Sequence, residues 1–130
     1  MKQILTSGKR KRAIARATFK KGTGNVKINN MFIEDYFADM YAMKVKEPLM
    51  LAGDKSKEFD IFVKVQGGGM NGQADAVRLA IARGLSENDK ALEEVFIKYD
   101  RNLIVADVRR NEPHKPGRSK PRAKRQKSYR

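Results

Sequence analysis

The sequence predicts an α+β fold, with one folded body over residues 1–108 and an extended basic tail over residues 109–130. Three observations predict this organisation. A chain of 130 residues is long enough for one domain with a modest core. Before Val108, apolar side chains recur at every second position in some segments and at helical spacing in others. After Val108 this periodicity ends, and three of the four prolines interrupt any helix or central strand.

Strands are predicted where apolar and polar residues alternate. In residues 11–20, three alanines and Phe19 fall on one face, and most of the basic residues fall on the other. Residues 59–66 alternate in the same way, and three consecutive glycines follow them. Residues 22–25 have turn chemistry and residues 26–28 can continue as a strand, so a hairpin is expected there.

Helices are predicted where the apolar spacing lengthens. Two short helices are expected, one over residues 33–41 and one near residues 47–52, the latter with Pro48 in its first turn and Gly53 at its end. The strongest helical pattern covers residues 73–85, and its many alanines would let it pack closely on a sheet.

The last elements of the body are a helix and a short strand. The helix is expected over residues 89–99, opened by Ser86 or Asn88 as its cap. Its inward side chains are expected to be Leu92, Val95, Phe96 and Tyr99. The apolar run 103–106 suits a final strand.

Positive charge is concentrated at the two ends of the chain. Residues 1–21 hold eight basic residues and no acidic ones, and residues 109–130 hold ten basic residues and one acid. The middle of the chain carries a net charge of −3, whereas the whole chain carries +14. Like-charged ends of this kind are typical of arms that bind nucleic acid, because a polyanion relieves their mutual repulsion.

Several function classes are excluded by residues that the chain lacks. Without cysteine there is no disulfide, thiol catalysis or cysteine-ligated zinc. No apolar run reaches the roughly 20 residues of a membrane span, and the N-terminus lacks a signal-peptide core, so we expect a cytoplasmic protein without a membrane partner. His114 is the only histidine, and no catalytic or metal-ligand spacing occurs. We therefore expect no enzyme, cofactor, metal or small-molecule substrate.

Residues 67–72 match the dinucleotide-binding pattern G-x-G-x-x-G, after a strand and before a helix. Glu93 stands at a suitable distance, but it lies within a helical pattern, whereas such an acid should end the next parallel strand. We interpret the glycines as packing residues that allow the helix to leave the sheet closely. A phosphate contact at the helix start stays open, and so does a nucleotide-dependent enzyme as an alternative class.

Residues 67–85 resemble a family signature. It has three glycines, two variable positions, a small residue and a glutamine, followed by small residues and a basic one at set distances. The corresponding residues here begin with Gly67, Gly68, Gly69, Gly72 and Gln73. The pattern is similar to that of the universal ninth protein of the small ribosomal subunit. Residues 7–17 resemble its opening strand, and residues 126–130 resemble the ending of its archaeal and eukaryotic members.

The resemblance implies a mixed four-stranded sheet with helices on one face and a left-handed βαβ crossover. It also implies a place in the head of the small subunit, beside neighbouring ribosomal proteins and bound to the large RNA of that subunit. The tail would reach the anticodon stem-loop of the P-site tRNA. Arg12 departs from the family pattern, which has a small hydroxyl residue there, and residues 114–121 are richer in proline than usual.

The resemblance and the charge pattern together give two sets of site residues. Ribosomal RNA would be bound by Lys9, Arg10, Lys11, Arg12, Arg16, Lys20, Arg109, Arg110, Lys115, Arg118, Lys120, Arg122, Lys124 and Arg125. Transfer RNA would be contacted by Lys127, Ser128 and Arg130. A free-standing RNA-binding protein is the alternative function, distinguished by the absence of ribosome association.

Overall fold

The computed structural model describes residues 3–106 and residue 109. It contains one five-stranded mixed sheet, in the order β1-β2-β5-β3-β4. The strands are β1 (Ile4–Arg10), β2 (Ala13–Lys21), β3 (Val26–Ile28), β4 (Met31–Phe32) and β5 (Phe59–Gln66). The helices are α1 (Ile33–Tyr36), α2 (Asp39–Ala52), α3 (Met70–Asn88) and α4 (Lys90–Tyr99), with short 3₁₀ helices η1 (Gly53–Glu58) and η2 (Arg101–Leu103).

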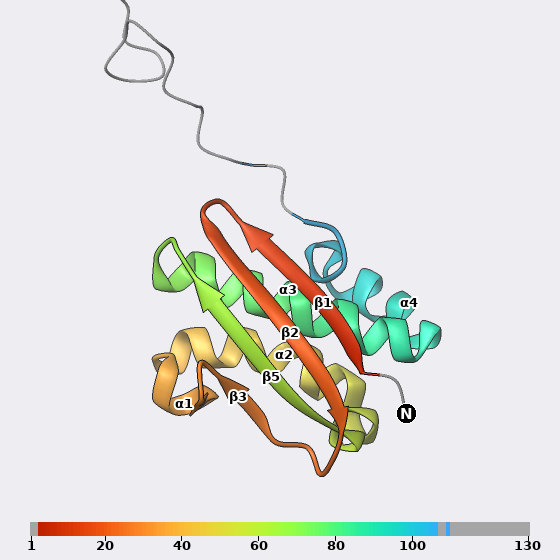
Figure 1. The fold of residues 1–130 in the computed structure, drawn as a ribbon. Coiled ribbons are helices and arrows are strands. Elements are labelled where there is room, and N and C mark those ends of the chain that lie inside the picture. The colour runs from red at the N-terminus through yellow and green to blue at the C-terminus, as the bar shows by residue number, and fades with distance from the viewer. Residues whose placement is uncertain (1–2, 107–108, 110–130) are drawn as a thin grey trace, which may run out of the picture.

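The core lies between the sheet and the helices. α3 packs across β1 and β2, α2 lies beside α3, and α4 packs against α3 (Figure 1). The inward residues of β2 are three alanines and Phe19, each at most 1% exposed, as the alternation predicts. Small inward side chains on both β2 and α3 let the helix approach the sheet closely, which confirms the packing expected of the alanine-rich segment.

The sheet has the architecture that the resemblance implies, with one more strand. β4 is the additional strand, and it is only two residues long. It pairs with β3 across Asn29 and Asn30, whose φ angles are +50° and +67°. Asparagine tolerates this left-handed region better than most residues, which explains a tight turn that the sequence reading did not identify.

The hairpin expected between residues 11–20 and 26–28 does not form. Both strands exist, but β5 lies between them, antiparallel to β2 and parallel to β3. The chain from β3 to β5 passes through α2 on the helix side of the sheet. In Figure 1 the helices lie behind the sheet and β5 runs toward the upper left. If the view is turned until β3 and β5 point upward, β5 lies to the right of β3. The crossover is therefore left-handed, against the general rule for such units.

The two short helices expected before β5 are divided differently. α1 ends at Tyr36 because Phe37 is extended and buries its ring, at 2% exposure. α2 then runs without a break from Asp39 to Ala52. The expectation that Pro48 lies in a first turn is wrong, since it stands inside α2 with its ring buried. Gly53 ends α2 as predicted, with φ at +61°.

The end of the body also differs from the sequence reading. Neither Ser86 nor Asn88 caps α4, because α3 continues through both, and Asp89 accepts the capping bond from the Ala91 N–H at 3.0 Å. Two of the four side chains expected to face inward, Val95 and Tyr99, are 41% and 56% exposed. The expected strand over 103–106 is absent. η2 instead ends at Leu103, and it begins where Asp100 accepts from the Asn102 N–H and starts a new helical turn.

Candidate nucleic-acid interface

The face of the sheet opposite the helices carries basic side chains from four strands. We call this the open face; its exposed and half-buried side chains are Leu5, Ser7, Lys9, Ile14, Arg16, Thr18, Lys20, Lys27, Phe32, Asp60, Phe62, Lys64 and Gln66. Five of these residues are basic and one is acidic. Alternation places them there, because their neighbours in the strands point into the core.

Asp60, the one acid of the open face, is held by the loop between β2 and β3. One carboxylate oxygen accepts hydrogen bonds from the backbone N–H groups of Thr23 and Asn25, each at 3.1 Å. The bond from Asn25, followed by that from Thr23, lowers the pKa of Asp60 below its ordinary value. The carboxylate thus orders the loop that crosses the start of β5.

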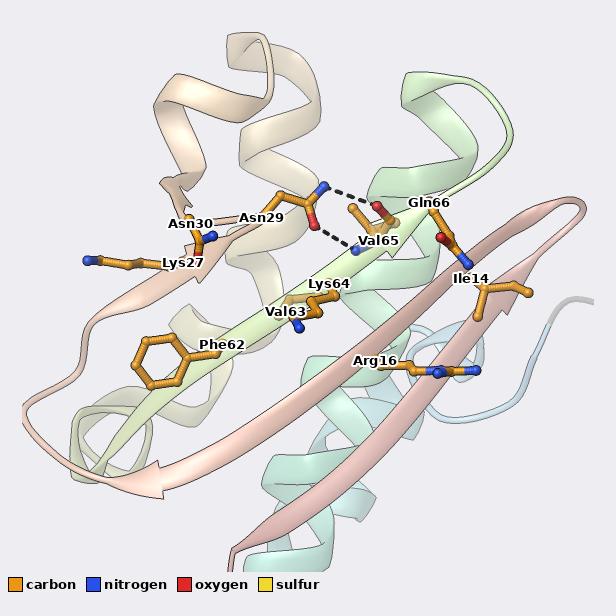
Figure 2. Close-up of a pocket in the computed structure, with 10 residues that line it drawn as sticks. All are labelled: Ile14, Arg16, Lys27, Asn29, Asn30, Phe62, Val63, Lys64, Val65 and Gln66. Carbon is orange, nitrogen blue, oxygen red and sulfur yellow. Dashed lines mark hydrogen bonds between the residues drawn. The ribbon is translucent and has the colours of Figure 1, made fainter.

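Two adjoining hollows lie on the open face. One, of about 380 Å³, extends over β5 toward Asn29 and Asn30 (Figure 2). The other, of about 520 Å³, extends toward Leu5 and Ser7 on β1. Arg16, Phe62 and Lys64 line both hollows, so these three side chains form the centre of one shallow trough.

The six predicted RNA-binding residues of the N-terminal end lie on the hairpin formed by β1 and β2, here called the first hairpin, but they do not all share one position. Lys9, Arg16 and Lys20 lie on the open face, whereas Lys11 and Arg12 form the exposed turn at the hairpin tip. Arg10 points to the opposite side, where its guanidinium lies 3.7 Å from the carboxylate of Asp75 on α3. It also donates to the backbone oxygen of Arg109 at 3.0 Å. The structure therefore brings three of these six predicted RNA-binding residues together on one face.

The glycine turn after β5 packs against this hairpin. Gly67 and Gly68 have φ angles of +79° and +64°. A Cβ atom on Gly67 would stand 2.5 Å from the backbone oxygen of Arg12, and one on Gly68 would stand 3.1 Å from the nitrogen of Ala13. Only glycine fits both the conformation and the space, which supports the interpretation of the turn as a packing feature.

Gln73 of the signature bonds within the fold. Its side-chain N–H donates to the backbone oxygen of Gly67 at 3.0 Å, and its side-chain oxygen accepts from the Tyr36 hydroxyl at 2.8 Å. Gln73 therefore ties the glycine turn to α1. The oxygen and the N–H of the Gln73 amide are therefore both hydrogen-bonded within the fold, which gives the glutamine of the signature a structural role beside the glycines.

Two arginines that the sequence reading did not place join distant segments. Arg78 on α3 donates to Glu47 of α2 at 2.5 Å and to Asp100 at 3.1 Å. Arg83, one turn later, donates to the backbone oxygens of Ser7 and Ile104. Their positions on one helix were visible in the sequence, but their partners come from three other parts of the chain.

The remaining predicted site residues are in the tail. Arg109 is described and exposed. The others lie outside the described residues: Arg110, Lys115, Arg118, Lys120, Arg122, Lys124, Arg125, Lys127, Ser128 and Arg130.

Comparison with known proteins decides the family. The sequence model of the ribosomal protein S9/S16 family matches residues 8–130. The chain belongs to the ribosomal protein S9/S16 family. The match covers the glycine turn, both predicted basic ends and nearly all of the body, so the resemblance inferred from residues 67–85 is confirmed.

Archaeal relatives cover the full chain. A protein named small ribosomal subunit protein uS9 from Thermoplasma volcanium is 52% identical over 132 residues. The protein of that name from Methanothrix thermoacetophila is 50% identical over 132 residues. Each comparison covers all of this chain and all of the relative. The relative of the same name from Thermoplasma acidophilum is 54% identical over 129 residues, covering 98% of this chain and all of its own.

Membership of the S9/S16 family makes the chain a structural ribosomal protein of the small subunit, and not an enzyme. Binding of ribosomal RNA is general in this family. The dinucleotide alternative also fails on the fold, because Glu93 lies on α4 and the sheet is not doubly wound. Among residues 3–106 and 109, no helix has the length and apolar character needed to span a bilayer.

The sequence predicted no role for four residues that the structure of this S9/S16 family member places on the open face. They are Lys27, Phe32, Phe62 and Lys64. Lys64 and Phe62 occupy the outward positions of a correctly predicted strand. Their alternation shows that they face away from the core, but it does not show that β5 lies beside β2. Only the strand order brings Lys64 next to Arg16.

Proposed function

We propose that this chain is a constituent of the small-subunit head, ribosome-bound in the cytoplasm, where it binds the large RNA of that subunit beside neighbouring ribosomal proteins. The folded body of residues 1–108 contacts ribosomal RNA through the open face and the hairpin tip. The tail of residues 109–130 continues along the RNA, and its last residues contact the anticodon stem-loop of the P-site tRNA.

The observation that carries the proposal is the open face of a chain in this family. Five cations face solvent there, and the only acid among the described residues of that face is bonded to the backbone of the neighbouring loop. Each cation that neutralises a phosphate releases condensed counterions, so binding is tight at low salt and falls steeply as salt rises. Arginine can also fork onto phosphate oxygens or stack on exposed bases.

The tail is proposed to act through the same chemistry. Its net charge of +9 suits the RNA backbone, and its prolines disfavour regular structure. Lys127, Ser128 and Arg130 would donate to tRNA phosphates. Such contacts position a tRNA without reading its sequence, which suits a site that accepts every tRNA.

Association with the subunit is tested by sedimenting a cell lysate through sucrose gradients, in magnesium and in EDTA, and blotting each fraction. We expect co-migration with the small subunit in both conditions and resistance to moderate salt. Recovery at the top of the gradient, away from both subunits, would reject the ribosomal role and favour a free-standing RNA-binding protein.

The tRNA contact is tested with the variant Arg130→Ala in reconstituted small subunits. We expect P-site tRNA affinity to fall by about 1 kcal/mol, or roughly fivefold, because one charge-assisted phosphate contact is lost. The control Lys98→Ala removes the same charge from α4, which lies on the helix side of the sheet, and should leave tRNA affinity unchanged. Equal affinities of the Arg130 variant and the unmodified chain across a salt series would contradict the contact.

A further inference from the structure

Two aromatic rings and a lysine between them lie in one row across the open face. The registers of β1, β2, β5, β3 and β4 place Leu5, Thr18, Phe62, Lys27 and Phe32 side by side in that order. Phe62 is 40% exposed and Phe32 is 50% exposed, so both rings are accessible from solvent. The Lys27 ammonium lies 5.5 Å from the centre of the Phe32 ring, and that of Lys20 lies 5.6 Å from the centre of the Phe62 ring.

A second row, two residues further along the strands, contains cations in place of rings. It places Ser7, Arg16 and Lys64 side by side. Arg16 and Lys64 are direct cross-strand partners, so their Cβ atoms stand about 5 Å apart. Like charges at this separation destabilise a sheet, and an anion between them would remove the penalty. The two rows are roughly 7 Å apart, which is two residues of strand rise.

This arrangement matches the chemistry of an unpaired nucleotide. A base can stack on an exposed ring while its phosphate meets the neighbouring cations. Bases in double-helical RNA are already stacked on one another, so aromatic side chains are used to bind loops, bulges and ends. The trough centred on Phe62, Arg16 and Lys64 provides both surfaces within one hollow.

The geometry points to a specific mode of RNA binding: the open face takes unpaired nucleotides, with a base on Phe62 and its phosphate between Arg16 and Lys64. Phe32 is the second stacking ring, two strands away, or about 10 Å at the usual strand spacing. This inference rests on the proposed function and names the class of RNA that the folded body recognises. The excess of cations on the open face favours RNA over an apolar protein segment as its occupant.

The test compares two RNA probes on the full chain. The first is a short oligouridylate with one central 2-aminopurine, and the second is a blunt RNA duplex of equal charge. We expect Phe62→Leu to weaken binding of the single strand about tenfold, because one stacked base is lost, and to leave duplex binding unchanged. Phe62→Tyr keeps the ring and should keep the affinity. The unmodified chain should quench 2-aminopurine fluorescence, and Phe62→Leu should not.

The charge arm uses matched pairs of substitutions. Replacing Arg16 and Lys64 together with glutamine should reduce the slope of log affinity against log salt for the single strand by about 1.4, which is two phosphate contacts. Replacing Lys90 and Lys98 of α4 with glutamine removes the same charge from the helix side and should not change it. The thermal midpoint of each variant shows that it folds.

Three outcomes would overturn the inference. Equal loss of single-strand and duplex binding in Phe62→Leu, or unchanged binding of both probes, would leave electrostatics as the only interaction of this face. Failure of the unmodified chain to bind either probe and to sediment with the small subunit would overturn the proposed function together with this inference.

Discussion

Single polar side chains hold together segments that are distant in the sequence. Arg78 joins α2 to the segment after α4, and Gln73 joins α1 to the glycine turn. Arg83 bonds the first strand and the last described segment of the body. The sequence shows that these three residues are polar side chains on a helix that packs against the sheet. Their partners could not be recognised from it, because each partner is brought close only by the tertiary fold.

Asp60 provides a prediction at this scale. Its pKa is lowered by hydrogen bonds from Asn25 and then Thr23, so the folded state binds this proton less tightly than the unfolded chain. The resulting stabilisation is present above the ordinary pKa of an aspartate and is lost as pH falls through the lowered value. In Asp60→Asn we expect lower stability than in the unmodified chain at pH 7, and a difference that shrinks below about pH 4.

Urea unfolding of both chains between pH 7 and pH 2 measures this difference. The control is Glu94→Gln, which removes an exposed carboxylate from the middle of α4 and should give no comparable loss at neutral pH. A constant difference between Asp60→Asn and the unmodified chain at every pH would show that charge on Asp60 does not contribute.

At the scale of elements, the glycine turn and the first hairpin form one packed unit. β2 and β5 were predicted correctly because each alternates over at least eight residues. β1 was not read as a strand from its own pattern, since its inward residues include Thr6 and Gly8 and supply little apolar alternation. Pairing with β2 and packing on α3 hold it in the sheet, and these are tertiary effects.

Alanine substitutions in the glycine turn test this packing. Gly67→Ala should destabilise the chain by at least about 1–2 kcal/mol, because its left-handed backbone disfavours a Cβ atom and the new atom would meet the Arg12 oxygen. The matched control is Gly69→Ala, where φ is −93° and no atom lies within 4 Å of the new Cβ. Gly69 is the N-cap of α3, where alanine is less favourable than glycine, so this variant should lose up to about 1 kcal/mol and clearly less than Gly67→Ala.

Thermal or urea unfolding of the two variants gives both values. Similar stabilities for Gly67→Ala and Gly69→Ala would mean that the hairpin shifts at no cost, which would contradict the close packing of the turn. An equally large loss in Gly69→Ala would show that capping of α3, and not the contact with Arg12, dominates at this turn.

At the scale of the whole molecule, charge and topology differ in how far sequence predicts them. The concentration of positive charge at both ends follows directly from counting residues. The family and its left-handed crossover followed from the signature around the glycine turn. The strand order did not follow from periodicity, because alternation fixes which side of a strand is buried but not which strand lies beside it.

The net charge predicts how the free chain responds to salt. A charge of +14, with Arg16 directly opposite Lys64, makes the unbound protein repel itself. Raising NaCl from about 0.01 M to about 0.1 M shortens the Debye length from roughly 30 Å to roughly 10 Å. We expect the melting temperature to rise by a few degrees, which corresponds to about 1 kcal/mol.

Differential scanning calorimetry of the free chain measures this response. The double variant with glutamine at positions 16 and 64 should respond less to salt, because one repulsive pair is already removed. A melting temperature that falls with added salt would mean that ion pairs such as Arg78–Glu47 outweigh the repulsion.

The place of β5 in the sheet also sets when the body can first fold during its synthesis. Its neighbours β2 and β3 are both complete by Ile28, but β5 begins only at Phe59. A growing chain that has not reached Gln66 has the first hairpin without the strand that joins it to β3, and an isolated hairpin is marginally stable in water. The basic first 21 residues therefore leave the translating ribosome well before the sheet that will hold them can close.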